Sequence, residues 1–316
     1  MPQMLTFTPN PALDVATTVA QLLESHKMRC EAPQLHPGGG GINVARVLHR
    51  LGADVLALYP AGGANGERLH QLLQAEGVPD LPLPVADETR QSFTAHEAST
   101  GREYRFVLPG PTLSPAEWQA ALARLRAELA RTPGPTCLVS SGSLPPGVPS
   151  DGHAQLAELA KTLGVRLALD TSGPALQAAL DVGVWLVKPS LRELSDWAGA
   201  PLKTRSAQRQ AAEQLLARGH AQMVALSLGS EGAMLVTADG SLHAPALPVT
   251  VRSSVGAGDS FLAGLLWSLE RGDTSETALA WASAAGTAAV ASSGTAQCEP
   301  TEIARWRSQV QVTRLG

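Results

Sequence analysis

The stretch SVGAGDSFLAGLL, residues 254–266, combines bare backbone with a single carboxylate. Gly256 and Gly258 flank Ala257, so backbone N–H groups can converge on an anion with no Cβ in the way. The apolar run that follows indicates a buried helix, whose first turn adds unpaired N–H donors and a positive dipole end. A phosphoryl group in transfer is such an anion. The Asp259 carboxylate cannot bind this anion, because both are negatively charged. Asp259 can instead accept the proton of a hydroxyl group that attacks the phosphoryl group.

Familiar phosphate-binding patterns do not account for this stretch. The chain lacks G-x-x-x-x-G-K-[ST], and G-A-G-D-S-F has Phe261 where a dinucleotide fingerprint requires its third glycine. A purely structural alternative is that Asp259 is the N-cap in an ordinary turn into a helix. The residues of this stretch alone leave both interpretations open.

A second stretch, PGGGGINVARVLHRLGA at 37–53, also places glycines before a helix. Four consecutive glycines are costly to order, which predicts the close approach of a ligand or of another backbone segment. Asn43, one turn into the helix, can both donate and accept hydrogen bonds. A tight turn into the helix is the alternative explanation.

A third stretch, VKPSLRELS at 187–195, follows a short apolar run. Ser190 and Glu193 have the S-x-x-E spacing of a capping box, which explains them without any ligand. A functional interpretation has Lys188 reach a nucleotide and Glu193 help to hold a hydrated metal ion. A fourth stretch, SLGSEGAML at 227–235, is typical of a hairpin.

Other side chains narrow the chemistry further. Arginine suits the bidentate grip of a phosphate group, although most exposed arginines are simply solvated. The basic residues of interest are Lys27, Arg29, Arg90, Arg102 and Arg105. The histidines show no metal-binding spacing, and no G-x-S-x-G supports a serine hydrolase.

The elements that must position these residues alternate along the chain. Short apolar runs typical of buried strands lie at 4–9, 54–60, 136–142, 165–170, 184–189, 223–229 and 233–237. Helical spacing appears between them at 42–52, 114–130, 151–164 and 207–219. This alternation predicts an α/β protein with a mostly parallel sheet covered by helices on both faces. A ligand is then expected at the carboxyl ends of the strands.

Two segments interrupt this alternation of strands and helices. Polar and apolar side chains alternate along residues 14–36 and 87–109, as they do in antiparallel strands with one solvent-exposed face. Because no linker or repeat divides the chain, we expect one domain over 1–316 in which these segments form a small β-sheet lid.

Bulk properties limit the partners and the location. The net charge of −4 argues against nucleic acid as the main partner. Cys30, Cys137 and Cys298 are far apart and odd in number, so we expect reduced, buried thiols rather than disulfides or a zinc site. No apolar run is long enough to span a membrane and no signal peptide is visible, which favours a cytoplasmic location.

The order of these stretches resembles the ribokinase-like sugar kinases, the PfkB family, over essentially the whole chain. PGGGGINVAR, SGSLPPG at 141–147, KPSLREL, SLGSEG and SVGAGDSF carry the resemblance. HPGGGGINVAR, PAGGANGE and REYRFVLPG are most similar to the 6-phosphofructokinase branch. Relatives such as 1-phosphofructokinase and tagatose-6-phosphate kinase usually carry G-G-K-G where this chain has glycine at position 40.

The resemblance implies a three-layer α/β/α sandwich with a mostly parallel central sheet, a small antiparallel β-sheet lid, and a homodimer formed through that lid. It also implies transfer of the γ-phosphoryl group of Mg-ATP to the C1 hydroxyl of fructose 6-phosphate, giving fructose 1,6-bisphosphate and ADP. Phosphorylation of fructose 1-phosphate or tagatose 6-phosphate is an alternative. A non-catalytic sugar-phosphate sensor on the same fold is an alternative of another class.

Carried onto matching positions, the resemblance makes Asp259 the base and the backbone of Gly256, Ala257 and Gly258 the anion hole. It implies that the sugar phosphate is held by Asp14, Gly39, Asn43, Ser143, Arg90 and Arg105, aided by Arg29. It implies that ATP is bound by Lys27, Lys188, Ser227, Gly229 and Gly232.

The metal sites implied by the resemblance are less complete. The family commonly has asparagine three positions before the glutamate, and here that position is Ser190, so the Mg²⁺ role depends more on Glu193. A loop that binds a monovalent cation such as K⁺ often lies beside the anion hole. Its expected residues here are Ser253, Val255 and Gly294.

Overall fold

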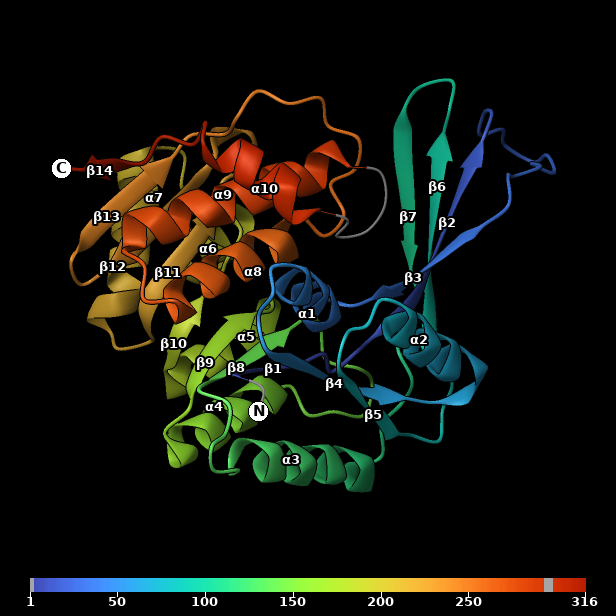
Figure 1. Ribbon diagram of the computed structural model, residues 1–316, viewed down its shortest axis with the longest axis horizontal. Coiled ribbons are helices and arrows are strands. Elements are labelled where there is room, and N and C mark those ends of the chain that lie inside the picture. Colours follow the sequence, from blue (N-terminus) through green and yellow to red (C-terminus); the bar gives the residue numbers. More distant parts are fainter. Residues whose placement is uncertain (1–2, 293–297) are drawn as a thin grey trace.

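The structure is a computed structural model that describes residues 3–292 and 298–316. Within these residues, ten strands form a central sheet in the order β14-β13-β12-β11-β10-β9-β8-β1-β4-β5 (Figure 1). The strands are β1 (Met4–Phe7), β4 (Val55–Ala61), β5 (Asp80–Pro84), β8 (Cys137–Ser141), β9 (Arg166–Asp170), β10 (Val184–Val187), β11 (Ala221–Ser227), β12 (Ala233–Thr237), β13 (Gly240–Ala244) and β14 (Thr313–Leu315).

The direction of the strands follows the prediction of a mostly parallel sheet. From β5 to β11 every neighbouring pair is parallel, while the pairs β11–β12, β12–β13 and β13–β14 are antiparallel. The pair β11–β12 is the hairpin expected at 227–235, and its turn is a short 3-10 helix, Gly229–Glu231. The edge strand β5 has prolines at 82 and 84, residues typical of strand edges, and its pattern gave no strand prediction.

Helices cover both faces of the sheet, and each face has its own apolar core. One face carries α1 (Gly40–Arg50), α2 (Gly63–Ala75), α8 (Ala257–Glu270), α9 (Ser275–Ala291) and α10 (Pro300–Arg307). The other carries α3 (Pro115–Leu129), α4 (Gly152–Leu163), α5 (Gly173–Val182), α6 (Leu191–Ala198) and α7 (Arg205–Ala217). The expected three-layer α/β/α sandwich is confirmed. Among the described residues, no helix is both long enough and apolar enough to cross a bilayer.

The lid is a separate sheet whose base contacts α1 and α2 and whose far end projects beyond the helices at the upper right of Figure 1. Within the described residues it has four strands in the order β3-β2-β6-β7, namely β2 (Ala12–Val19), β3 (Gln34–Gly38), β6 (Arg90–Glu97) and β7 (Arg102–Val107). The lid itself was predicted, but the expectation of a wholly antiparallel sheet was wrong, because β2 and β6 pair in parallel. Both strands leave the carboxyl-end rim of the central sheet, β2 after β1 and β6 after β5, so they run in the same direction.

The cysteine prediction also needs one correction. Cys137 and Cys298 are buried thiols, as expected, but Cys30 is exposed because it lies in the connection between β2 and β3 at the lid. Burial raises the pKa of Cys137 to about 12, so that thiol stays protonated.

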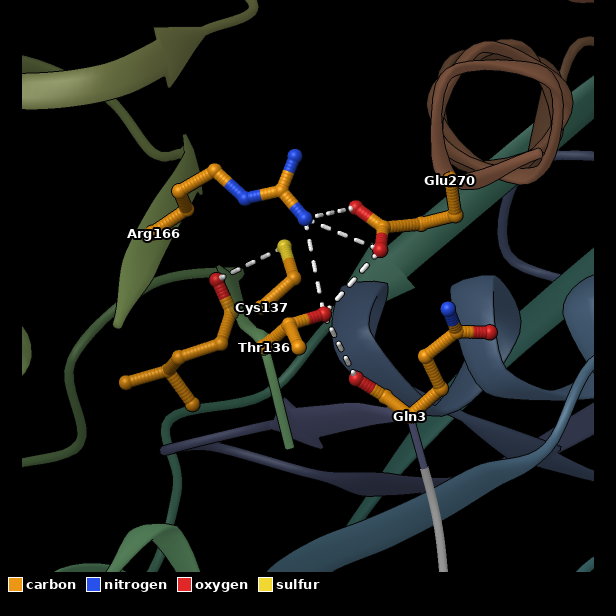
Figure 2. A network of polar contacts seen from close by, with 6 residues as sticks. Gln3, Thr136, Cys137, Arg166 and Glu270 are labelled. Atoms are coloured by element: carbon orange, nitrogen blue, oxygen red, sulfur yellow. Dashed lines mark hydrogen bonds and ion pairs between the residues drawn. The ribbon is translucent and has the colours of Figure 1, made fainter. Parts of the chain in front are cut away.

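Helix α8 is fastened at its carboxyl end by a polar network (Figure 2). The side chain of Glu270, the last residue of α8, is buried, and both its oxygens accept hydrogen bonds from Arg166 Nη2, at 2.7 and 2.9 Å. Thr136 Oγ1 donates to the same carboxylate at 3.1 Å and lies 3.4 Å from the Gln3 carbonyl oxygen. The network ties α8 to the beginnings of β1, β8 and β9, at the end of the helix opposite to Asp259.

Candidate active site

Two cavities lie at the carboxyl ends of the parallel strands, where a ligand was expected. The first, which we call the lid cavity, has a volume of ≈ 270 Å³ and lies between the lid and the central sheet. Every residue predicted to hold the sugar phosphate lines it except Arg29; they are Asp14, Gly39, Asn43, Arg90, Arg105 and Ser143. Glu193, Val255, Gly256 and Asp259 line it too.

The second, the hairpin cavity, has a volume of ≈ 940 Å³ and lies beside the β11–β12 turn. Ser227, Gly229 and Gly232, which were predicted to meet ATP, line it together with Ser190. The remainder of its wall is mostly small or apolar and includes Val251, Phe261, Gly286 and Thr287, which the sequence analysis did not identify.

The first turn of α8 is shared by the two cavities. Gly256 and Asp259 line the lid cavity, whereas Ala257 and Gly258 line the hairpin cavity. Gly256 is the N-cap and has a left-handed backbone with φ 76°, which glycine adopts without strain. The backbone N–H groups of this turn have no partner within the helix, so they can stabilise negative charge between the two cavities.

Asp259 is held by Asn43 of α1. Asn43 Nδ2 donates to Asp259 Oδ2 at 2.8 Å, and within the described part of the chain the buried Asn43 Oδ1 has no hydrogen-bond partner. Burial, reinforced by the nearby Asp170 carboxylate, raises the pKa of Asp259 to about 6, although the Asn43 hydrogen bond acts in the opposite direction. The result is a carboxylate that is ionised at neutral pH but still basic enough to accept a proton.

A buried ion pair lies against this turn. Lys188, which follows β10, is only 6% exposed, and its Nζ lies 3.1 Å from Asp170 Oδ1. Burial by itself would lower the pKa of Lys188, but neighbouring carboxylates, Asp170 foremost, outweigh it and raise that pKa. A Cβ added to Gly258 would lie 3.4 Å from Lys188 Nζ, so the ammonium group is close to the backbone of the first turn of α8.

Asp170 is a site residue that the sequence analysis missed. It lines the lid cavity as the last residue of β9, and burial raises its pKa, an effect that Lys188 opposes. The signal was available, because a carboxylate that ends a buried parallel strand lies at the rim where ligands bind.

The run of four glycines is explained by contacts with the chain itself. A Cβ at Gly38 would lie 2.4 Å from Asp14 Oδ2, and a Cβ at Gly40 would lie 2.1 Å from Ser141 Oγ. At Gly38 and Gly40 the close neighbours are therefore side chains that line the lid cavity, whereas the expected approach of backbone is found at Gly41, where a Cβ would lie 2.7 Å from the Phe7 carbonyl oxygen.

The lid supplies the charged side chains of its cavity. Asp14 is buried, and its Oδ1 has no hydrogen-bond partner among the described residues. Burial raises the pKa of Asp14 to about 6 against the opposing effect of Arg105 and Arg90. The Arg90 guanidinium donates to the carbonyl oxygens of Asn10, Leu108 and Pro11 at 2.8, 3.0 and 3.3 Å, so Arg90 also fixes the backbone around the cavity.

A buried histidine fixes the floor of the lid cavity. His153 Nε2 lies 3.2 Å from the carbonyl oxygen of Gly142, and Nδ1 lies 3.1 Å from Ser140 Oγ. Burial lowers the pKa of His153 to about 4, so the neutral ring donates from Nε2 and accepts from Ser140. Thr171 Oγ1 donates to the same Gly142 oxygen at 2.9 Å. These bonds orient the peptide that precedes Ser143, whose Oγ accepts from Asn10 at 3.2 Å.

The remaining predicted residues have different outcomes. Lys27 and Arg29 are exposed in the connection between β2 and β3, and neither is among the described residues that line the two cavities. Ser190 and Glu193 form the capping box of α6. Ser253 is buried near the first turn of α8, whereas Gly294 lies outside the described residues. Across residues 3–292 and 298–316, no group of three or more His, Cys, Asp or Glu side chains could hold a metal ion.

Comparison with known proteins agrees with this geometry. Residues 11–302 match the pfkB family carbohydrate kinases. The chain belongs to this family. It is 44% identical over 305 residues to an ATP-dependent 6-phosphofructokinase isozyme 2 from Mycobacterium tuberculosis, which covers 96% of this chain and 89% of the relative. A 1-phosphofructokinase from Xanthomonas campestris is 39% identical over 83% of each chain.

A solved structure extends the likeness to three dimensions. The phosphofructokinase-2 of Escherichia coli in complex with substrates and products superimposes with a TM-score of 0.93 at 38% identity, covering 97% of this chain and 99% of that one. Crystals of the same bacterial protein contain potassium in one case and a tetrameric inhibited form in another. The resemblance stated from the sequence is therefore confirmed at the level of family and fold.

Proposed function

We propose that this chain is an ATP-dependent 6-phosphofructokinase, which transfers the γ-phosphoryl group of Mg-ATP to the C1 hydroxyl of fructose 6-phosphate. The products are fructose 1,6-bisphosphate and ADP. One observation carries the proposal: the first turn of α8 lies between a small, charged cavity and a large, mostly apolar one. A sugar phosphate suits the first and a nucleotide the second, and the γ-phosphoryl group crosses where they meet. The likeness to 6-phosphofructokinases over nearly the whole chain supports the choice of sugar.

On the sugar side, Asp259 removes the proton of the attacking hydroxyl. The hydroxyl oxygen then bonds to the γ-phosphorus, the bond to the bridging oxygen of ATP breaks, and ADP leaves. Asn43 holds Asp259 through Nδ2 and offers Oδ1 to a sugar hydroxyl. Asp14 and Ser143 accept further hydroxyl groups beside Gly39, and Arg90 and Arg105 bind the phosphate already on the sugar.

On the nucleotide side, backbone N–H groups at Ala257 and Gly258 stabilise the transferring phosphoryl group. The buried ammonium of Lys188 adds positive charge next to them. The hairpin cavity receives the nucleoside part of ATP against backbone and small side chains, of which Ser227, Gly229 and Gly232 were predicted.

The carboxylates present fit a magnesium ion that arrives with ATP. Mg²⁺ usually keeps several waters and takes one or two protein carboxylates together with substrate phosphates. Glu193 and Asp170 line the lid cavity beside Asp259 and would supply those carboxylates, and Ser190 holds Glu193 through the capping box. When bound, Mg²⁺ neutralises charge on the phosphates. We propose Ser253 and Val255 for a monovalent cation such as K⁺.

We further propose that 1–316 acts as one kinase domain and that the lid joins two copies of it. The outer face of the lid exposes Phe93 and Phe106, whose ring centroids are 6.4 Å apart. A second copy would cover these rings and bring Lys27 and Arg29 of one subunit toward the cavities of the other. Light scattering is expected to show a dimer, with activity that falls on extreme dilution. A fully active monomer would contradict this.

The activity itself is tested by measuring ADP release with Mg-ATP in parallel wells. The sugars are fructose 6-phosphate, fructose 1-phosphate, tagatose 6-phosphate, fructose and ribose, compared by kcat/KM. We expect fructose 6-phosphate to be preferred. Preference for another phosphorylated sugar would keep the mechanism and change the substrate. Binding of ATP and a sugar phosphate without ADP release would favour the non-catalytic sensor.

A further inference from the structure

A lid strand contacts the segment that leads into the anion hole. Ser253 Oγ donates to the Glu103 carboxylate of β7, at 3.2 Å to Oε1 and 3.4 Å to Oε2. Ser253 is buried, whereas Glu103 belongs to an exposed strand. The partners are 150 residues apart in the chain, so this contact joins the lid to the loop before α8.

The same hydroxyl fixes the backbone on its other side. Val255 N–H donates to Ser253 Oγ at 3.2 Å, and Val255 directly precedes Gly256, the N-cap of α8. The Ser253 hydroxyl therefore accepts from one backbone N–H while it donates to Glu103. Since Ala257 and Gly258 follow Gly256 at once, the position of this turn sets the direction of the N–H groups that face the phosphoryl group.

The opposite end of this connection is the sugar-phosphate site. Alternate residues of a strand lie on the same face, so Glu103, Arg105 and Val107 share one face of β7. Arg105 and Val107 line the lid cavity. One short strand face thus carries both a cation for the sugar phosphate and the carboxylate that holds Ser253.

We infer that Glu103 is a positioning residue that links occupation of the sugar-phosphate site to the geometry of the anion hole. The inference rests on the proposed function. A phosphate bound by Arg105 fixes the position of β7, Glu103 then holds Ser253, and the turn at Gly256 presents its N–H groups to ATP. Without the sugar, this restraint on the turn is weaker, so ATP binds in a less reactive arrangement and is protected from transfer to water.

The consequence is a coupling between two ligands that do not share their main binding residues. By linkage, the sugar phosphate must change the affinity for the nucleotide by the same factor as the nucleotide changes the affinity for the sugar. We define this factor as the ratio of the nucleotide Kd values without and with saturating sugar. A coupling of about 5-fold or more is expected for the unmodified protein.

The test measures this coupling by calorimetry with fructose 6-phosphate and a non-hydrolysable Mg-ATP analogue. In Glu103→Ala this ratio of nucleotide Kd values is expected to fall to about 2 or less, where 1 means no coupling. Each ligand alone is expected to bind as it does to the unmodified protein. Glu103→Gln is expected to retain the coupling, because its amide oxygen still accepts the Ser253 hydroxyl. Adding Ser253→Ala to Glu103→Ala is expected to cause no further loss, since both changes break one connection.

Two controls separate positioning from other roles. Glu31→Ala removes another exposed lid glutamate and is expected to leave the coupling unchanged. Raising KCl at constant ionic strength is expected not to restore the coupling in Glu103→Ala. If it does restore it, Glu103 is a cation ligand and the inference is wrong. Because Glu103 is exposed, its truncation removes no core packing, and an unchanged thermal unfolding midpoint is expected.

The inference and the proposed function fail in different ways. If the unmodified protein binds neither fructose 6-phosphate nor the nucleotide, the proposed function fails. If it binds both without coupling, or if Glu103→Ala keeps the full coupling, only the role of Glu103 is overturned.

Discussion

The two cavities on either side of α8 are built in different ways. The lid cavity, at ≈ 270 Å³, is lined by charged and polar side chains such as Asp14, Arg90, Arg105 and Asp170. The hairpin cavity, at ≈ 940 Å³, is lined mainly by glycine, small side chains and apolar side chains. The first lining suits a ligand recognised by charge and hydrogen bonds, whereas the second suits a ligand recognised by its shape and by backbone contacts. Specificity for the sugar should therefore depend on the side chains of the lid cavity, whereas nucleotide binding should depend on the volume of the hairpin cavity.

The hairpin turn illustrates how backbone creates the second cavity. Gly232 has φ 96°, and a Cβ there would lie 2.0 Å from the carbonyl oxygen of Ala244. Only glycine permits this close approach of β13 to the turn. Under the proposed function, the charges that face the first turn of α8 belong to ATP itself, so this cavity needs no comparable charged side chain.

The largest effect is expected at the boundary between the cavities. Asp259→Asn removes the proton acceptor but keeps the shape of the side chain, so kcat should fall by roughly 10²- to 10⁴-fold. Binding of both substrates should change little, which calorimetry can check. Asp239→Asn, in the exposed turn between β12 and β13, is the matched control and should retain full activity. Turnover of Asp259→Asn within about threefold of the unmodified protein would exclude Asp259 as the base.

A substitution in the lid cavity should change KM for the sugar phosphate without changing KM for ATP. Arg105→Ala is expected to raise KM for fructose 6-phosphate by roughly 10- to 100-fold, the scale of a hydrogen bond between charged groups. KM for ATP should stay within about twofold, because Arg105 does not line the hairpin cavity in the described part of the chain. Arg105 is a cleaner choice than Arg90, whose guanidinium also binds three backbone carbonyl groups. Equal changes in both KM values would contradict a role in phosphate binding.

A substitution in the hairpin cavity should instead change KM for ATP with little effect on KM for the sugar phosphate. Gly286 lines it from α9, so Gly286→Leu should fill part of the nucleotide space and raise KM for ATP about tenfold, with little change for the sugar phosphate. Gly286→Ala is the matched control. A Cβ there would lie 3.5 Å from Ala257 O and Phe261 Cβ, an ordinary contact, so it should fit and stabilise the helix by about 0.5–1 kcal/mol. Thermal unfolding measures that gain, and an unchanged KM for ATP in Gly286→Leu would show that ATP binds elsewhere.

The same contrast explains what the sequence could and could not predict. Asp259 with its glycines, and Asn43 after the glycine run, were identified because their residue types suggest chemistry on their own. The apolar wall of the hairpin cavity, including Val251 and Phe261, has no such signature, because these residues look like any core residue. His153 was missed because its role depends on a contact with Gly142 that only the fold creates, whereas Asp170, the partner of Lys188, could have been identified from its position at the end of a buried strand. Lys27 and Arg29 were assigned by resemblance, and one chain alone does not bring them to a cavity.

The smallest effect expected is a shift in the pH dependence, and it tests how the lid cavity tunes its base. Asp259 must be ionised to accept a proton, and burial raises its pKa to about 6. Activity should therefore be full above that pH and fall about tenfold per pH unit below it. The Asn43 hydrogen bond favours the ionised form, so Asn43→Ala should move the acid limb of kcat to higher pH, in addition to lowering the rate.

Asp14 also has a pKa raised to about 6, so its contribution must be separated from that of Asp259. Asp14 lines the lid cavity, the proposed sugar site, and should act through binding, whereas kcat reports groups that titrate in the complex with substrate. The acid limb of kcat is therefore expected to persist in Asp14→Asn and to shift only in Asn43→Ala. An acid limb that disappears in Asp14→Asn would assign the titration to the sugar-binding carboxylate, and Asp259 would then have to be ionised well below pH 6 despite its burial beside Asp170.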